Sequence, residues 1–309
     1  MAQKKSPADV NELGRLVMPL KRDSFESAWS PDGKRVATAR GRIWDLPARN
    51  LAMELEKRSN CSNVAWSPDG HRIANLDTSG RIWLFDADSG SRVAEIATGA
   101  EGYGVAFSPD GRELVAGNWN GNIGRWSASD GKVIDTIALR GWMVHDVWYR
   151  TAGAIGMSVL ERGVGVHHVE WENGAANEKW LLPPDCERLV PVDMKHAMTW
   201  AADEAILLNL SNGKIVHRMR LGKAEKGTTI RVKLVVPSPA GNLFAAIVST
   251  DFKSKQYIPS IDAFVVFDQK SIKGRYVTEY ANHVAFSPDG GMLALSTWHA
   301  GEIREMTPN

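Results

Sequence analysis

The sequence is poor in cysteine and in net charge, and both shortages exclude classes of protein. Its two cysteines, Cys61 and Cys186, stand far apart and lack metal-ligand spacing, so they indicate neither a disulfide framework nor a zinc site. With 37 basic and 36 acidic residues, the chain has a formal net charge of +1 at pH 7. This balance gives no general attraction to nucleic acid or to an anionic membrane.

Long apolar runs are also missing. No run approaches the roughly 18 residues that a membrane-spanning helix needs, although 43% of the 309 residues are hydrophobic. The first residues, MAQKKSPADVNELGRLVMPLKR, are basic but lack the apolar core of a secretory signal. We therefore expect a cytoplasmic protein with a sizeable core and no membrane contact, at the upper end of the size range of single domains.

The usual motifs of catalysis and cofactor binding are absent from the sequence. There is no phosphate-binding loop and no G-x-S-x-G turn. His167 and His168 lie in an expected strand, where neighbours point to opposite faces and cannot chelate one ion. Gly102-Tyr103-Gly104 begins like a dinucleotide fingerprint, but it leads into a strand and lacks the third glycine. We expect no enzyme activity, no cofactor, no metal and no catalytic residues.

What the sequence does contain is one short segment written four times. AWSPDG stands at residues 28–33 and 65–70, and AFSPDG at residues 106–111 and 285–290. The first residues favour a strand, the proline presets a turn, the aspartate can bond the backbone two residues on, and the glycine accepts positive φ. Apolar runs such as residues 72–75 follow, so each copy predicts a hairpin between two strands.

These turns divide the chain into seven units. The expected turns lie at or near Pro31, Pro68, Pro109, Thr151, Asp193, Pro239 and Pro288. A third strand follows each hairpin, as in RIWLFD at 81–86, and a fourth follows in most units, as in RVAEIA at 92–97. Four short strands per roughly 40 residues, with no helical period, predict the blades of a β-propeller. We place the blades at approximately 25–57, 62–97, 103–139, 144–182, 187–220, 230–280 and 283–306.

The last unit has only three strands, while the chain begins with an unassigned strand at residues 13–20. We expect this strand to complete the last blade and close the ring, which removes two exposed sheet edges. Residues 1–11 are then a flexible tail, and residues 12–309 form a single all-β domain, a seven-bladed propeller.

The chain resembles the WD-repeat β-propellers over residues 12–306. The resemblance rests on the four S-P-D-G turns, on Trp44-Asp45 in RIWD, and on LDTSGRIWLFD, where Asp77 precedes Trp83 by six residues. Asn120 and Trp126 repeat this spacing, with asparagine in place of the aspartate. No blade shows Gly-His before its first strand, and the middle blades lack the tryptophan. The six-bladed TolB-like propellers share the turn, but they are typically exported, and seven units fit this chain better.

Most tryptophans have a packing explanation, since they fall at matching positions of the expected strands. We assign to the core Trp29, Trp44, Trp66, Trp83, Trp126, Trp148, Trp171, Trp180 and Trp200.

The resemblance implies that partners bind the face that carries the loops leading into the blades and the loops between second and third strands. We call this the top face. On it, Tyr103, Trp119, Trp142, Met143 and His145 gather on blades three and four as an aromatic patch with the composition of a binding hot spot. Blade six adds a long insertion at 249–262, whose length is typical of a functional loop.

From that insertion we take Phe252 and Tyr257 as partner-binding residues. The expected function is a non-catalytic scaffold or adaptor that binds another protein or peptide. Two alternatives remain open. One is a binder of nucleic acid or another polyanion through residues 217–233, which hold six basic residues and one acidic residue; steep salt dependence would identify it. The other is an enzyme with its site in the central channel, which convergent titratable groups with perturbed pKa values would indicate.

Overall fold

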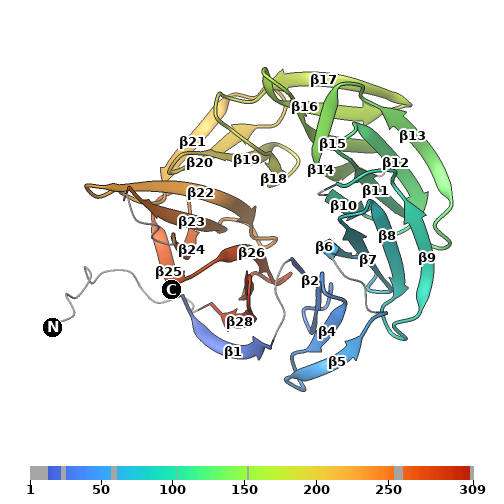
Figure 1. The fold of residues 1–309 in the computed structure, drawn as a ribbon, viewed down its shortest axis with the longest axis horizontal. Coiled ribbons are helices and arrows are strands. Elements are labelled where there is room, and N and C mark those ends of the chain that lie inside the picture. The colour runs from blue at the N-terminus through green and yellow to red at the C-terminus, as the bar shows by residue number, and fades with distance from the viewer. Residues whose placement is uncertain are drawn as a thin grey trace.

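The chain forms a ring of seven antiparallel sheets in a computed structural model (Figure 1). The structure describes residues 13–21, 26–56, 61–102, 104–151, 153–253 and 260–306. Within these residues it has 28 strands and no helix, and each sheet contains four strands. An all-β, seven-bladed propeller, as predicted, is confirmed. Among the described residues no helix has the length and apolar character that a bilayer crossing requires.

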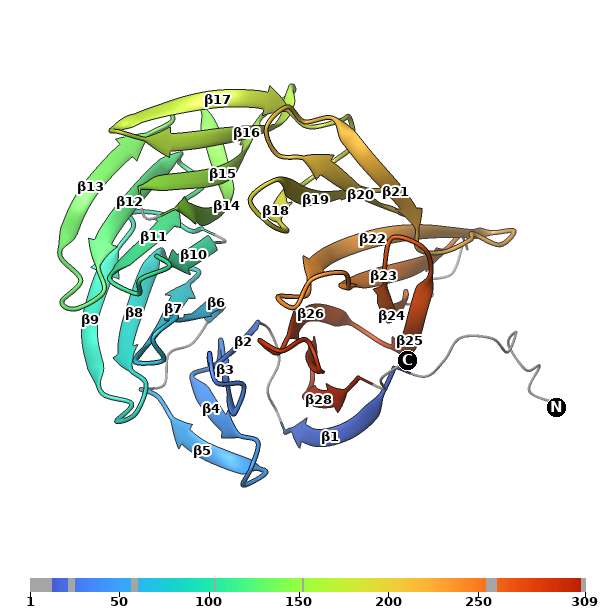
Figure 2. The same ribbon diagram turned by 180° about the vertical axis from the view of Figure 1, so that it is seen from behind.

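Each blade is a meander that runs from the centre of the ring to its rim (Figures 1 and 2). The strands of blades one to three are β2 (Ser27–Trp29), β3 (Arg35–Thr38), β4 (Arg42–Asp45), β5 (Asn50–Glu54), β6 (Cys61–Trp66), β7 (Arg72–Asp77), β8 (Arg81–Asp86), β9 (Arg92–Ala97), β10 (Gly104–Phe107), β11 (Glu113–Gly117), β12 (Asn122–Ser127) and β13 (Val133–Ala138).

Blades four to six continue the same order around the ring. Their strands are β14 (Trp142–Thr151), β15 (Ala154–Glu161), β16 (Gly165–Glu172), β17 (Ala175–Leu181), β18 (Val190–Pro191), β19 (His196–Ala201), β20 (Glu204–Asn209), β21 (Ile215–Arg220), β22 (Thr228–Pro237), β23 (Phe244–Phe252), β24 (Ile261–Phe267) and β25 (Ile272–Thr278). Blade seven contains β26 (Ala281–Phe286), β27 (Met292–Thr297), β28 (Gly301–Glu305) and β1 (Arg15–Leu20).

The N-terminal strand closes the ring. β1 pairs antiparallel with β28 and forms the outer edge of blade seven. Its buried side chains Met18 and Leu20 pack between blades seven and one. Leu13, just before the strand, packs between blades six and seven. The predicted closure is therefore confirmed: one segment pairs with the last strand and fills the space beside two neighbouring blades.

The hydrophobic core is divided among the seven contacts between neighbouring blades. Seven clusters of buried residues each combine side chains from two adjacent blades. The expected core tryptophans lie in these clusters or are otherwise largely covered; Trp180 is half-buried and the other eight are buried. Burial of large aromatic surface between sheets is the main stabilising contribution expected in such a ring.

The repeated S-P-D-G turn has the same hydrogen bonds in each clear copy. In blade one, the hydroxyl of Ser30 donates to Asp32 at 2.6 Å and accepts the backbone N–H of Arg35 at 2.9 Å. The serine–aspartate bond recurs in the other three copies. Gly33 closes the turn with a φ of 69°, a conformation that favours glycine. In this tight turn, a side-chain group thus accepts a hydrogen bond from a backbone N–H that has no backbone partner.

Blade two contains the aspartate–tryptophan pair that the resemblance implied. Trp83 donates its indole N–H to Oδ2 of Asp77 at 2.9 Å. The other carboxylate oxygen accepts the backbone N–H groups of Ser79 and Arg81. Asp77 therefore ties the turn between the second and third strands to the third strand.

The corresponding residue of blade three is Asn118, so the assignment of Asn120 to this position was wrong by two residues. Asn118 Oδ1 accepts the N–H groups of Asn120 and Asn122, which matches the two backbone bonds of Asp77. In these turns the N–H of the glycine donates to the carbonyl of the first turn residue, and this bond decides which asparagine corresponds to Asp77. Trp126 consequently lies two positions further along its strand than Trp83. Its ring covers Gly124, where an added Cβ would lie 2.4 Å from the ring.

Blade four lacks the aspartate–tryptophan pair and has a different buried arrangement. His168 stacks on Trp148 at a centroid distance of 5.7 Å and contacts Trp180. Burial lowers the pKa of His168 to about 4, so the ring is neutral at pH 7. Its neighbour Glu170 is held by Arg150 and Lys179. The middle blades are therefore stabilised by histidine–tryptophan packing and a partly buried ion-pair network.

Candidate functional site

Main-chain hydrogen bonds hold the loops of the top face together. In blade three, the N–H of Trp119 donates to the carbonyl of Glu101 at 2.9 Å. In blade seven, the N–H of Trp298 makes the same kind of bond to the carbonyl of Tyr280 at 3.0 Å. Each bond joins the loop between the second and third strands to the loop that leads into the same blade. In blades three and seven, these bonds fix the turn after the second strand against the loop that enters the blade.

Two of the predicted partner-binding residues, Tyr103 and Tyr257, lie outside the described residues. Trp119 is half-buried in the turn between β11 and β12. The carbonyl of Asn118 accepts the N–H of Val144 at 3.1 Å, which places this turn against the first strand of blade four. Trp119 and the start of β14 are thus neighbours, as the predicted patch requires.

The other three residues of the patch stand at the beginning of β14. Trp142 stacks on His167 with a centroid distance of 4.8 Å and an interplanar angle of 13°. Nδ1 of His145, at a bulge of the strand, lies 3.2 Å from the carbonyl oxygen of Glu187 in the next blade. Met143 is half-buried between them. Part of this surface is therefore used for contacts within the ring, and part remains accessible.

In the predicted insertion of blade six, most of the described residues belong to strands. β23 continues to Phe252, β24 begins at Ile261, and residues 254–259 lie outside the described residues. Ser249 and Asp262 are fully buried. The assignment of 249–262 as one loop was therefore wrong, because both strands of the hairpin extend into it. Phe252 is half-buried opposite Thr228 at the end of β23. Blade six, which contains this strand, lies across the ring from blade three (Figure 1).

Among the described residues, the most accessible aromatic residue of the top face was missed in the sequence. The structure describes all twelve tryptophans, and Trp298 alone among them is exposed, at 57%. Tyr280 is 36% exposed and stacks edge-on against His299. Trp298 follows the turn residue Thr297 just as Trp119 follows Asn118. Alignment of the turns could have identified Trp298 from the sequence, since Trp119 stands at the same position in blade three.

A second group of side chains lies in the innermost strands or just before them. We call it the central cluster; it consists of Glu26, Asn63, Asp146, Arg188 and His283. Each stands five residues before its turn position, and all five are half-buried. The groups belong to blades one, two, four, five and seven, so residues far apart in the sequence meet at the centre of the ring (Figure 1).

Hydrogen bonds connect the central cluster across blade boundaries. Asn63 donates its amide N–H to Oε2 of Glu26. Arg188 binds Asp146 with two nitrogen atoms, and its Nε lies 2.8 Å from Oδ2. Nδ1 of His283 accepts the backbone N–H of Ser27 at 3.3 Å. In a neutral imidazole the proton must then reside on Nε2.

The surroundings shift the pKa values of two of these groups strongly. Part of the Glu26 surface remains accessible, but blades surround it, and this desolvation raises its pKa to about 8. The positive charge of Arg188 opposes the rise, and the negative charge of Asp146 adds to it. Burial, assisted by Arg188, lowers the pKa of His283 to about 4. Both side chains are therefore mainly neutral at pH 7.

Next to His283, Asn282 has an unusual position. It lies at a bulge of β26, and both polar atoms of its side chain are buried without a hydrogen-bond partner. An unsatisfied buried amide is costly. The central cluster itself contains titratable groups with perturbed pKa values, as expected of a functional centre. Among the described residues, no group of three or more His, Cys, Asp or Glu could hold a metal ion.

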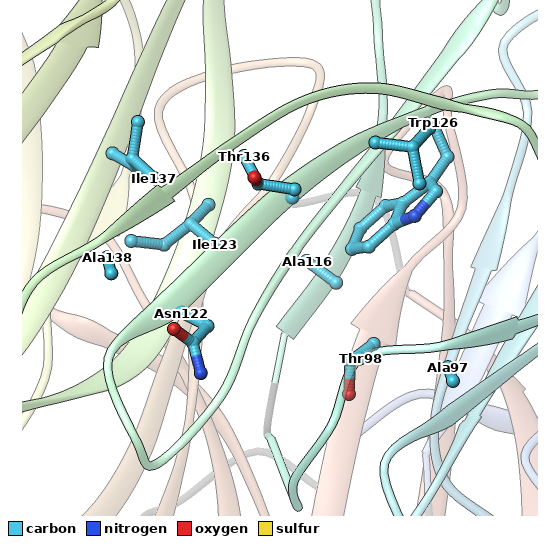
Figure 3. Close-up of a pocket in the computed structure, with 11 residues that line it drawn as sticks. Ala97, Thr98, Ala116, Asn122, Ile123, Trp126, Thr136, Ile137 and Ala138 are labelled. Carbon is cyan, nitrogen blue, oxygen red and sulfur yellow. The ribbon is translucent and has the colours of Figure 1, made fainter.

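A separate pocket of about 380 Å³ lies at the boundary of blades two and three (Figure 3). Ala97 and Thr98 line it from the end of β9, and Ile123 and Trp126 line it from β12. Its walls are mostly apolar, with no charged side chain among them. This pocket does not include any residue of the aromatic patch or of the central cluster.

The comparisons with known proteins agree on the architecture. The family model described as "WD domain, G-beta repeat" matches residues 98–133. The chain is similar in structure to the C-terminal WD40 domain of Sif2, with a TM-score of 0.71 and 14% identity, over 97% of this chain and 100% of that chain. No curated protein sequence matches the chain. At this level of identity the structural likeness shows the fold alone, and fold does not determine function.

Proposed function

Since the chain is a β-propeller of the WD-repeat type, we propose that it serves as a non-catalytic platform that binds another protein or a peptide on its top face. Propellers of this type are in general interaction scaffolds rather than enzymes. The observation that supports the proposal best is the exposure of Trp298, at 57%, beside Tyr280 and His299. Exposed tryptophan is the side chain most enriched at binding hot spots.

The aromatic patch of blades three and four supports the same interpretation. Trp119 occupies the position of Trp298 in its own blade, and the main chain holds both residues in the same way. Met143 and His145 keep part of their surface accessible nearby. Because main-chain bonds hold the turns of Trp119 and Trp298, a partner that contacts both residues would not have to order these turns, which lowers the entropic cost of association.

The basic segment gives less support to the polyanion alternative. Four of its six basic residues pair with acidic residues: Arg218 and Arg220 with Glu204, Arg231 with Asp251, and Lys233 with Asp262. These pairs neutralise much of the positive charge on which a phosphate backbone would depend. A protein or peptide therefore remains the partner that the surface favours.

The proposal is tested with Trp298→Ala in the full chain. Val133→Ala is the matched control, because Val133 is 63% exposed but lies on the outer strand β13. Proteins captured by the tagged wild-type chain are quantified by mass spectrometry, and the affinity of the recovered partner is then measured. We expect Trp298→Ala to weaken binding at least about tenfold, the effect of a hot-spot residue, and Val133→Ala to leave it unchanged. Equal binding by both variants would contradict the proposal.

A further inference from the structure

The central cluster lies beside the blade-seven part of the proposed binding face. Tyr280 is exposed at the end of the loop that leads into β26, and Asn282 and His283 follow within that strand. His283 in turn contacts the backbone of blade one next to Glu26. A partner seated over Tyr280 and Trp298 would therefore have the central cluster within reach of a long side chain.

The charges in the cluster are unequally matched. Asp146 forms an ion pair with Arg188. Glu26 accepts hydrogen bonds from the neutral side-chain amide of Asn63 and from the backbone N–H of Val64. Among the described residues, no lysine or arginine lies within ion-pair distance of Glu26. The guanidinium group of Arg188 pairs with Asp146, so the carboxyl group of Glu26 has no cationic partner in direct contact.

The remaining groups also suit a positively charged ligand. His283 is neutral, so it does not repel a cation. An anion would instead meet the carboxylate of Asp146, which already occupies the Arg188 guanidinium. The geometry therefore favours a cation over an anion.

We propose that the central cluster binds a cationic side chain, the ammonium group of a lysine or the guanidinium group of an arginine, with Glu26 as its counter-ion. The side chain would be carried by the partner on the top face, so the physiological role rests on the proposed function. On binding, the Glu26 carboxyl group releases its proton to solvent and pairs with the cation as a carboxylate. Binding and ionisation of Glu26 are thus coupled.

The site itself is tested without any partner. The probes are n-butylammonium and ethylguanidinium, with neutral n-butanol as control, added to the full chain at matched ionic strength. The carboxyl carbon of Glu26 is followed by ¹³C NMR during a pH titration, and its signal is assigned by its loss in Glu26→Gln. This variant should fold normally, because glutamine has nearly the shape of the protonated glutamic acid and still accepts the Asn63 hydrogen bond. Glu172→Gln makes the same chemical change at an exposed site.

We expect both cations, but not n-butanol, to lower the pKa of Glu26. Probe binding should be about 25-fold tighter at about pH 8.5 than at about pH 6.5, the ratio of the ionised fractions of a group with a pKa of about 8. Glu26→Gln should abolish this pH dependence, and Glu172→Gln should preserve it. An unchanged titration of Glu26 in the presence of both cations overturns the proposal. Loss of partner binding in Trp298→Ala without any effect of the probes would support the top-face function and reject this site.

Discussion

Trp83 donates its indole N–H to the carboxylate of Asp77 across 2.9 Å, and both side chains are buried in blade two. Asp77 also binds the backbone of its turn, so the pair joins a loop of the top face to the packing between blades. Trp83 belongs to the cluster between blades one and two. The pair therefore fixes local turn geometry and blade packing at once.

We expect mutations of Trp83 to separate the contribution of its packing from that of its hydrogen bond to Asp77. Trp83→Ala should lower the free energy of unfolding by about 3–5 kcal/mol, since it removes a buried aromatic side chain. Trp83→Phe keeps most of the packing and should cost less, mainly through the lost partner of the Asp77 carboxylate. Denaturant unfolding monitored by circular dichroism measures both. A Trp83→Ala variant as stable as Trp298→Ala would contradict a core role for Trp83.

Removal of the closing strand should open the ring. Deletion of residues 1–20 removes β1, exposes the edge of β28 and uncovers the apolar surface against which Met18 and Leu20 pack. We expect a clearly lower melting temperature and self-association, because unpaired strand edges and apolar surface promote contacts between chains. Thermal unfolding and analytical ultracentrifugation measure the two effects.

Deletion of residues 1–11 is the matched control for ring opening, since it leaves β1 and Leu13 in place. We expect this shorter deletion to melt like the full chain and to remain in the same association state. If deletion of residues 1–20 also melts like the full chain, β1 does not hold the ring closed.

The corrected turn residue of blade three gives a direct comparison of two neighbouring asparagines. Asn118→Ala removes the acceptor of the N–H groups of Asn120 and Asn122, and Asn118 is fully buried. We expect a loss of about 1–3 kcal/mol in the free energy of unfolding, the cost of unsatisfied buried groups. Asn120→Ala, at an exposed position, should change stability by no more than about 0.5 kcal/mol. The reverse order would restore Asn120 as the turn residue.

The fold could be predicted because its signals are local and repeated. Each S-P-D-G segment sets one hairpin, and its recurrence reveals the number of blades even where the turn near Thr151 or Asp193 has a different sequence. The closing strand was recognisable because blade seven otherwise has three strands. Register was harder: Asn118 and Asn120 both fit an asparagine ahead of a tryptophan, and only the hydrogen bond of the turn glycine distinguishes them.

The central cluster could not be assembled from the sequence in the same way. Glu26 and His283 are separated by most of the chain, and no spacing between them indicates that they meet. Their shared position, five residues before a turn, was nevertheless readable once the turns were aligned. The pKa shifts depend on crowding by five blades, which no local pattern expresses.

Of the residues that the sequence assigned to the binding face, Trp119 has the clearest test. It is half-buried, whereas Trp83 is buried. We expect Trp119→Ala to weaken partner binding at least about tenfold, as at a hot spot, and to lower the melting temperature less than Trp83→Ala does. Affinity measurements and thermal unfolding of both variants test this prediction. A Trp119→Ala variant that binds normally and is as unstable as Trp83→Ala would place Trp119 in the core.

The two perturbed groups of the central cluster should contribute to the pH dependence of stability with opposite signs, and their contributions overlap between about pH 4.5 and pH 6.5. The pKa of Glu26 is about 8 in the folded protein and 4.5 ordinarily. Between these values the folded state keeps a proton that the unfolded chain has released, so the free energy of unfolding falls as pH rises. For His283 the pKa is lowered from 6.5 to about 4. There the unfolded chain binds the extra proton, so stability falls as pH decreases through this range.

Substitution of each group should remove its own part of this profile. Relative to the wild type, Glu26→Gln should gain stability as pH rises from about 5 to about 8, because glutamine has no proton to release. Relative to the wild type, His283→Gln should gain stability as pH falls from about 6.5 to about 4, and the difference between the two proteins should stay constant above about pH 6.5. Urea unfolding across this range measures both, with Glu172→Gln as the exposed control. If the Glu26→Gln profile is parallel to that of the wild type, Glu26 ionises freely in the folded protein, and the ring centre does not exclude its charge.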